Sequence, residues 1–253
     1  MNLSNINRGL LLVLFFGAPC FAINMENTEL TAQVPINVPT TIPPQLEALE
    51  KASAALVHNS KELIQPELIS YKEELMDNKG NKLIRYYDAS LPPDQRWQQL
   101  EVIGKNISQS QLQIDIPLVL SPTLLTQGEP DFYGENDQNW IFAIKSSVNA
   151  QNEGQESVEL MEANSKLQSY LKTFVHIDKK TQKFTRLEIV NTKPFKPSTL
   201  AKIEIFSIVV DYAQVWPAGP LVAKHSVRTL KGSYGLFIGI DEKITQQLSQ
   251  FSI

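Results

Sequence analysis

Acidic side chains are the first candidates for chemistry in this sequence. Residues 129–138, EPDFYGENDQ, hold a group of them: Glu129, Asp131, Glu135 and Asp137. An EF-hand calcium loop needs oxygen ligands at alternating positions, a central glycine and a closing bidentate glutamate. Counted from Glu129, the central Gly134 falls in place, but Trp140 stands where the closing glutamate should be. The pattern therefore favours a solvated loop over a metal site, and no metal site is predicted.

The histidines are His58, His176 and His225, and none belongs to a catalytic motif. An HExxH pair and a GxSxG nucleophile elbow are both absent from the sequence. One enzymatic alternative stays open: a hydrolase site assembled from distant strands, for which Asp88, His176 and His225 are the candidates. Otherwise no catalytic residue is predicted. Because phosphate-loop, dinucleotide and haem motifs are also absent, the sequence predicts no cofactor.

A third group of candidates lies in residues 85–105, RYYDASLPPDQRWQQLEVIGK. Asp88 can accept hydrogen bonds from turn amides, and Arg96 can pair with Asp88 or Asp94. The proline pair between them imposes an extended connection, after which Trp97 restarts a strand. We expect a structural corner pinned by a contact between Asp88 and Arg96. The alternative interpretation is the polar rim of a ligand pocket.

The first 22 residues have the pattern of a cleaved secretory signal. Arg8 precedes a short apolar run, and small residues precede Ala22, where cleavage is expected. The run is about half as long as a membrane-spanning helix, so stable membrane insertion is not predicted. Cys20 raises the alternative of a lipidated cysteine, which the preceding Pro19 disfavours. The predicted location is the periplasm.

Composition excludes several classes of function. Cleavage after Ala22 removes Cys20, the one cysteine of the chain, and with it any disulfide or thiolate site. The formal net charge is −4 for the whole chain. Loss of Arg8 makes the mature chain one unit more negative, and an acidic surface argues against a nucleic-acid partner. Residues 23–44 are Pro-rich and predicted to be a disordered lead segment, followed by a single domain over 45–253.

The elements of that domain follow from hydrophobic periodicity. Residues 45–60 predict an amphipathic helix whose apolar face contains Leu46, Leu49 and Leu56. Alternating runs then predict strands over residues 69–75, 82–88, 96–103, 139–147, 172–178, 183–191, 201–215, 219–232 and 235–245. The fold class predicted from this order is mainly β (α+β): a curved antiparallel sheet or incomplete barrel with the early helix packed on it.

Two segments are less well defined by their pattern. Residues 114–138 contain Pro117, Pro122 and Pro130 and predict a partly buried connection. Residues 156–172 fit either a strand with a helical turn or one helix, and the sequence leaves both open.

The segment YYDASLPPDQRWQQLEVIGK resembles a recurring stretch of uncharacterised exported proteobacterial proteins, in which it also follows a glycine-containing hairpin. The later segments TRLEIVNTKPFKP and GPLVAKHSVRTLKGSYGLFIGIDE continue this likeness, which covers roughly residues 68–253. In layout the chain resembles, more distantly, the outer-membrane lipoprotein carriers (LolA/LolB-like). That resemblance implies an incomplete antiparallel barrel whose concave side receives acyl chains.

The strands themselves also indicate an apolar ligand. Residues 201–215 alternate at first and then become apolar on both faces, as do residues 139–144. Two apolar faces require cover on both sides of the sheet. We therefore expect a non-catalytic carrier of a lipid-like chain. The predicted ligand-binding residues are Trp97, Trp140, Phe142, Phe206 and Ile208. An interior filled by its own side chains, as in a structural envelope protein, is the alternative.

Overall fold

The structure is a computed structural model. It describes residues 42–61, 66–104, 116–120, 122, 130–144, 169–217, 219–235 and 238–253. The predicted signal peptide, most of the lead segment and most of residues 156–172 lie outside the described residues. Within those described, no helix is both long and apolar enough to span a membrane.

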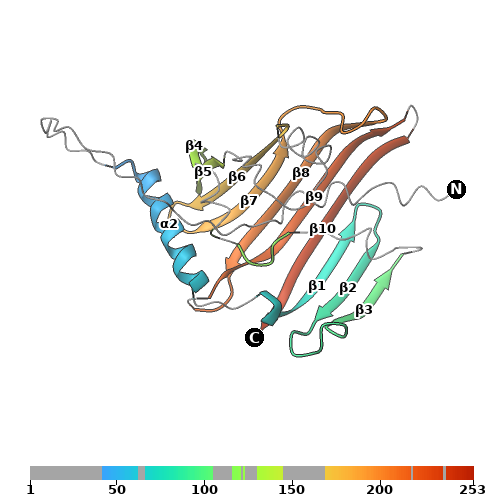
Figure 1. Ribbon diagram of the computed structural model, residues 1–253, viewed down its shortest axis with the longest axis horizontal. Helices are drawn as coiled ribbons and strands as arrows, with labels where there is room; N and C mark the ends of the chain where they lie inside the picture. Colours follow the sequence, from blue (N-terminus) through green and yellow to red (C-terminus); the bar gives the residue numbers. More distant parts are fainter. Residues whose placement is uncertain are drawn as a thin grey trace, which may run out of the picture.

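The described strands form one twisted antiparallel sheet of 10 strands that does not close on itself (Figure 1). The strands are β1 (Ser70–Asp77), β2 (Lys82–Tyr87), β3 (Trp97–Ile103), β4 (Pro130–Glu135), β5 (Asn139–Ile144), β6 (Leu171–Asp178), β7 (Phe184–Asn191), β8 (Ala201–Gln214), β9 (Leu221–Tyr234) and β10 (Ile238–Ser252). Their order across the sheet is β3-β2-β1-β10-β9-β8-β7-β6-β5-β4. Two meanders, β1 to β3 and β4 to β10, are therefore joined where β10 pairs with β1, and the predicted fold class is confirmed.

The early helix is α2 (Pro44–Lys61), close to its predicted bounds, and a 3-10 turn, η2 (Pro66–Leu68), follows it. Pro44 suits a first helical position, where an amide proton would have no helical partner. The buried stripe of α2 is Ala48, Ala52 and Leu56, spaced four residues apart. Leu46 was predicted on this face but is 40% exposed. Small side chains on the contact stripe bring the helix backbone close to the sheet.

Register relates the side chains of all the strands, because directly paired residues point to the same face. One row crosses the whole sheet: Phe132, Phe142, Val175, Leu187, Val210, Ser226, Gln246, Leu75, Leu83 and Val102. Several members of this row pack in the same buried cluster as the α2 stripe. We call this side the helix-facing face, and the opposite side the outer face.

Two strand segments were not predicted. Residues 130–135 form β4, where Phe132 pairs with Phe142 and their rings lie 5.7 Å apart in an edge contact. The prediction of a partly buried connection without a strand was wrong for these residues. The second half of β10 was missed because its sequence, QQLSQFS, has few apolar side chains. That half is held by pairing with β1, which is distant in the chain, so local periodicity does not signal it.

Candidate ligand-binding face

The predicted ligand-binding residues all lie on the helix-facing face, but they do not form one group. Phe142 is fully buried in the cluster beneath α2, and Trp140 and Ile208 pack against that cluster half-buried. Phe206 belongs to a second cluster further along β7 and β8. Ile208 contacts both clusters and so makes the apolar surface continuous between them. Trp97 lies apart on the edge strand β3 and is 41% exposed.

The cluster beneath α2, here called the apolar cluster, is built from long-range neighbours. Its buried members are Ala48, Ala52, Leu56, Leu120, Phe142, Ile144, Val175, Ile177, Phe184, Leu187, Val210, Tyr212, Leu221, Ala223 and Leu248. Residues 116–120 reach it by bridging the start of β9, where Ala223 N donates to Leu118 O at 2.8 Å. The Tyr212 hydroxyl donates to Pro117 O at 3.1 Å. Burial raises the pKa of Tyr212 above its usual range, as expected for a hydroxyl in a low-dielectric interior.

An aromatic group continues the helix-facing face towards β3. Tyr71 and Tyr87 stack with ring centroids 5.3 Å apart, and Trp97 meets them edge-on at 5.7 and 5.1 Å. Phe251 lies 6.2 Å from Tyr71. Tyr71 and Phe251 also pack against the apolar cluster. Aromatic side chains therefore connect the surface beneath α2 with the β3 edge.

Beside the aromatic group, a chain of buried polar side chains crosses four strands of the same face. Ser226 on β9 donates to Gln246 Oε1 on β10 at 2.7 Å, and Gln246 Nε2 donates to Glu73 Oε1 on β1 at 2.5 Å. Arg85 on β2 donates through Nε to the other oxygen of Glu73. Glu73 is only 3% exposed, so its charge needs these partners.

Sequence reasoning missed this polar chain, although its signal was present. Glu73 occurs in phase with Tyr71 and Leu75, and Arg85 in phase with Leu83 and Tyr87. When a charged residue occupies a position on the apolar face of a predicted strand, either the strand is assigned to the wrong face or the charge has a buried partner of opposite charge. Only the pairing of β1 with β2 places the acid opposite the base.

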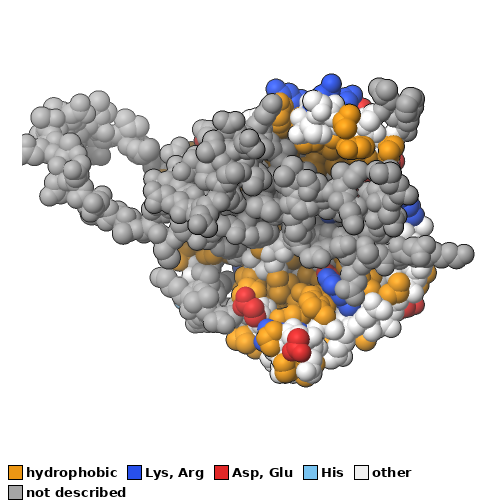
Figure 2. Space-filling model, turned by 45° about the vertical axis from the view of Figure 1, so that its right-hand side comes forward, with side chains coloured by type: hydrophobic (Ala, Val, Ile, Leu, Met, Phe, Trp, Pro, Cys, Tyr) orange, Lys and Arg blue, Asp and Glu red, His pale blue; other side chains and the backbone are white. Residues whose placement is uncertain are grey.

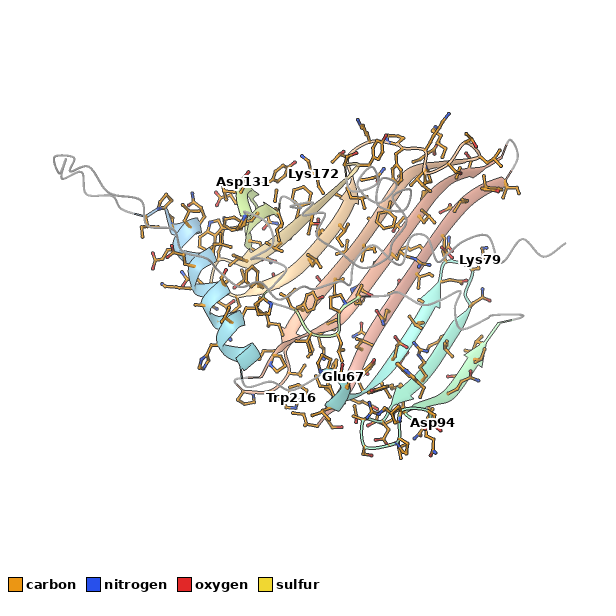
Figure 3. All side chains as sticks on the ribbon, in the orientation of Figure 1. Glu67, Lys79, Asp94, Asp131, Lys172 and Trp216 are labelled. Atoms are coloured by element: carbon orange, nitrogen blue, oxygen red, sulfur yellow. The ribbon has the colours of Figure 1, made fainter. Side chains whose placement is uncertain are left out.

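The predicted corner between β2 and β3 exists, but not through the expected side-chain pair. Asp88 N donates to Arg96 O at 2.8 Å, while the Asp88 carboxylate accepts from Ser90. The Arg96 guanidinium donates instead to Leu91 O at 2.9 Å and to the Tyr87 hydroxyl at 3.0 Å. The Asp–Arg contact is thus between backbone groups. Figure 3 labels Asp94 in this corner and Trp216 in the connection from β8 to β9.

The three candidate residues of the hydrolase alternative do not lie together in the structure. His176 and His225 both lie on the outer face, in a row of charges across β6 to β9. His176 Nε2 lies 3.4 Å from Glu188 Oε1, and His225 Nδ1 lies 3.3 Å from Asp211. Arg186 links the two pairs and binds Asp211 at 2.7 Å. Asp88, in the β2–β3 corner, is not part of this row.

Within the acidic stretch, residues 130–138 form one arm and the turn of the hairpin between β4 and β5. Glu135, on β4, pairs with Lys179 at 3.0 Å, and the Asn136 side chain accepts the amide protons of Gln138 and Asn139. Within the described ranges, no group of three or more His, Cys, Asp or Glu side chains could hold a metal ion.

Comparisons with known proteins concern the layout of the chain. No family model matches it, and no curated protein matches it. Among solved structures, it is similar to a LolA superfamily protein from Nitrosomonas europaea, with 11% identity and a TM-score of 0.32. That match covers 83% of this chain and 93% of the other. At this level of similarity the match carries no argument about function, which has to be derived from the residues themselves.

Proposed function

We propose that this protein is a non-catalytic binding or carrier protein for an apolar, lipid-like ligand, and that it works in the periplasm after removal of residues 1–22. The observation that carries the proposal is the extent of the helix-facing face. The row of side chains that crosses it from Phe132 on β4 to Val102 on β3 is apolar except for Ser226 and Gln246, and both end residues are exposed.

The described helix covers only part of this surface. Its buried stripe contributes two alanines and Leu56, and the helix contacts β6, in the half of the sheet that ends at β4 (Figure 1). Half-buried Trp140, Ile208 and Tyr71 lie at the border of the apolar cluster. Figure 2 shows hydrophobic side chains gathered in patches between charged ones. An acyl chain gains roughly 0.8 kcal/mol for each methylene that it buries on such a surface, before ordering costs.

Extraction of the protein from its native envelope tests the proposal. We expect the mature chain in the periplasmic fraction, with Ile23 as its first residue and lipid in the organic extract by mass spectrometry. The purified chain should bind a fluorescent fatty acid, and unlabelled fatty acid should displace it. A chain that carries no lipid and binds no fatty acid would instead support a structural envelope protein.

Adjacent residues on β8 provide a matched pair of variants. Ile208 and Val209 are both half-buried, but Ile208 lies on the helix-facing face and Val209 on the outer face. We expect Ile208→Asn to weaken fatty-acid binding about tenfold, because a polar group would be buried against the chain. Val209→Asn should leave the affinity within about twofold. Equal losses in both variants would mean that the ligand does not bind this face.

A further inference from the structure

The side chain of Arg85 is held in an unusual way on the helix-facing face. Its Nε binds Glu73, and its guanidinium lies over the Trp97 ring, 3.8 Å from the ring centroid. The side chain is 12% exposed. Within the described residues, no hydrogen-bond partner is present for its two terminal Nη groups. The guanidinium is thus held in place and largely desolvated, and its two Nη groups are available to donate hydrogen bonds to a ligand.

A guanidinium fork of this kind matches the two oxygens of a carboxylate or phosphate. Glu73 and Trp97 fix the plane of the fork, so little conformational freedom remains to be lost on binding. The second oxygen of Glu73 is already bound to Gln246. Both oxygens of the Glu73 carboxylate therefore have partners, and the carboxylate does not cover the Nη groups of Arg85.

Charge around the aromatic group favours an anion. Three cations lie over its rings: Arg85 over Trp97, Arg96 5.9 Å from the Tyr87 ring and Lys224 4.8 Å from the Phe251 ring. Among the described residues, Glu73 is the carboxylate that contacts these cations, through Arg85. Burial raises the pKa of the Tyr71 hydroxyl above its usual range, with Glu73 acting in the same direction, which indicates a low-dielectric surrounding. Electrostatic interactions are stronger in such surroundings than in water.

The arginine is also close to the apolar cluster. Arg85 pairs across the sheet with Glu73, and Glu73 pairs with Leu248, a buried member of that cluster. Two strand spacings correspond to roughly 10 Å between Arg85 and Leu248. An acyl chain lying over the apolar cluster can therefore present its head group to Arg85.

From this arrangement we propose that the ligand is an acyl chain with an anionic oxygen head group, and that Arg85 binds this head group while Glu73 and Trp97 orient the arginine. The inference rests on the proposed apolar-ligand function and makes it more specific. A free fatty-acid carboxylate and a phosphate monoester share the required chemistry.

Head-group selectivity of the wild-type protein is the first test. A fluorescent fatty acid is displaced in parallel by hexadecanoate, hexadecyl phosphate, hexadecanol and hexadecyltrimethylammonium, which share the same alkyl length. We expect the two anions to displace the probe at concentrations at least tenfold lower than the alcohol and the cation. The better of the two anions identifies the source of the head group. Equal displacement by all four would overturn the role of Arg85 and leave the carrier function standing, whereas no binding of any of them would overturn both.

Substitutions at Arg85 form the second test. Arg85→Met leaves Glu73 buried without its counter-charge and can fail to fold. The double variant Glu73→Gln/Arg85→Met removes both charges, and Arg85→Lys keeps the charge but loses the fork. We expect both to reduce the anion preference to less than about threefold while hexadecanol binding is retained. Lys82→Met, on the same strand but the outer face, is the matched control. An anion preference that persists in the double variant would overturn the proposal.

Discussion

At the scale of single residues, the structure depends on a few positions that tolerate little change. One is Gly232 on β9, opposite a bulge in β8 between Ile203 and Ile205. A Cβ atom at this position would lie 2.1 Å from the carbonyl oxygen of Lys202. The close approach is between backbones, so no side-chain rotation can relieve it.

Gly232→Ala is therefore expected to destabilise the protein by about 2–3 kcal/mol, as overpacking typically does. Urea unfolding followed by circular dichroism measures the change. Gly239→Ala on the neighbouring strand is the control, because a Cβ there meets no atom within 4 Å. Similar unfolding midpoints for both variants would show that the β8–β9 contact relaxes at no cost.

At the scale of elements, the residues of α2 that contact the sheet differ in part from those that the sequence pattern predicted. Of the predicted apolar face, Leu56 is buried and Leu49 packs against the apolar cluster, but Leu46 is exposed and Ala48 and Ala52 complete the contact. Glu47 and Lys51, 2.6 Å apart on the exposed side, add the few tenths of a kcal/mol typical of such helix pairs.

Enlarging the contact stripe tests this packing. Ala52→Leu is expected to cost about 1–3 kcal/mol, because the added atoms have no space against the sheet. Ala54→Leu, on the exposed side of the same helix, should change stability by less than about 0.5 kcal/mol. Thermal unfolding of the two variants provides the comparison. A neutral Ala52→Leu would mean that α2 moves freely away from the sheet.

At the scale of the whole molecule, carboxylates tied to cations and turn amides couple stability to pH. A hydrogen bond from Lys72 lowers the pKa of Glu74, and the Thr181 amide lowers that of Asp178. The His176 imidazole lowers the pKa of Glu188. Their folded-state pKa values lie below the unfolded ones, so their stabilisation is complete above the unfolded values and is lost as pH falls through the folded ones.

We therefore expect the urea midpoint to decrease as the pH is lowered below about 4, where unperturbed carboxyl groups titrate. Asp178→Asn should be less stable at neutral pH but lose less on acidification, because the variant has no carboxylate there to protonate. A midpoint that increases between pH 4 and pH 2 would contradict this assignment of the titrating groups.

The sequence by itself determined the features that depend on neighbouring residues. Hydrophobic periodicity was sufficient for α2 and for strands such as β1 and β2, whose connecting turn contains Gly80 with a positive φ. Phe206 and Ile208 are two positions apart and therefore share a face of β8, but the apolar residues on both faces of this strand did not decide which face receives α2.

Tertiary structure alone decided the features that depend on residues far apart in the chain. Pairing of β10 with β1 joins the two meanders and brings Gln246 to Glu73, a contact across 173 positions that no local pattern encodes. It also extends β10 through a polar stretch and separates Trp97 from the other predicted ligand residues. Local periodicity reports which face a side chain occupies, whereas the register between distant strands decides which side chains meet on that face.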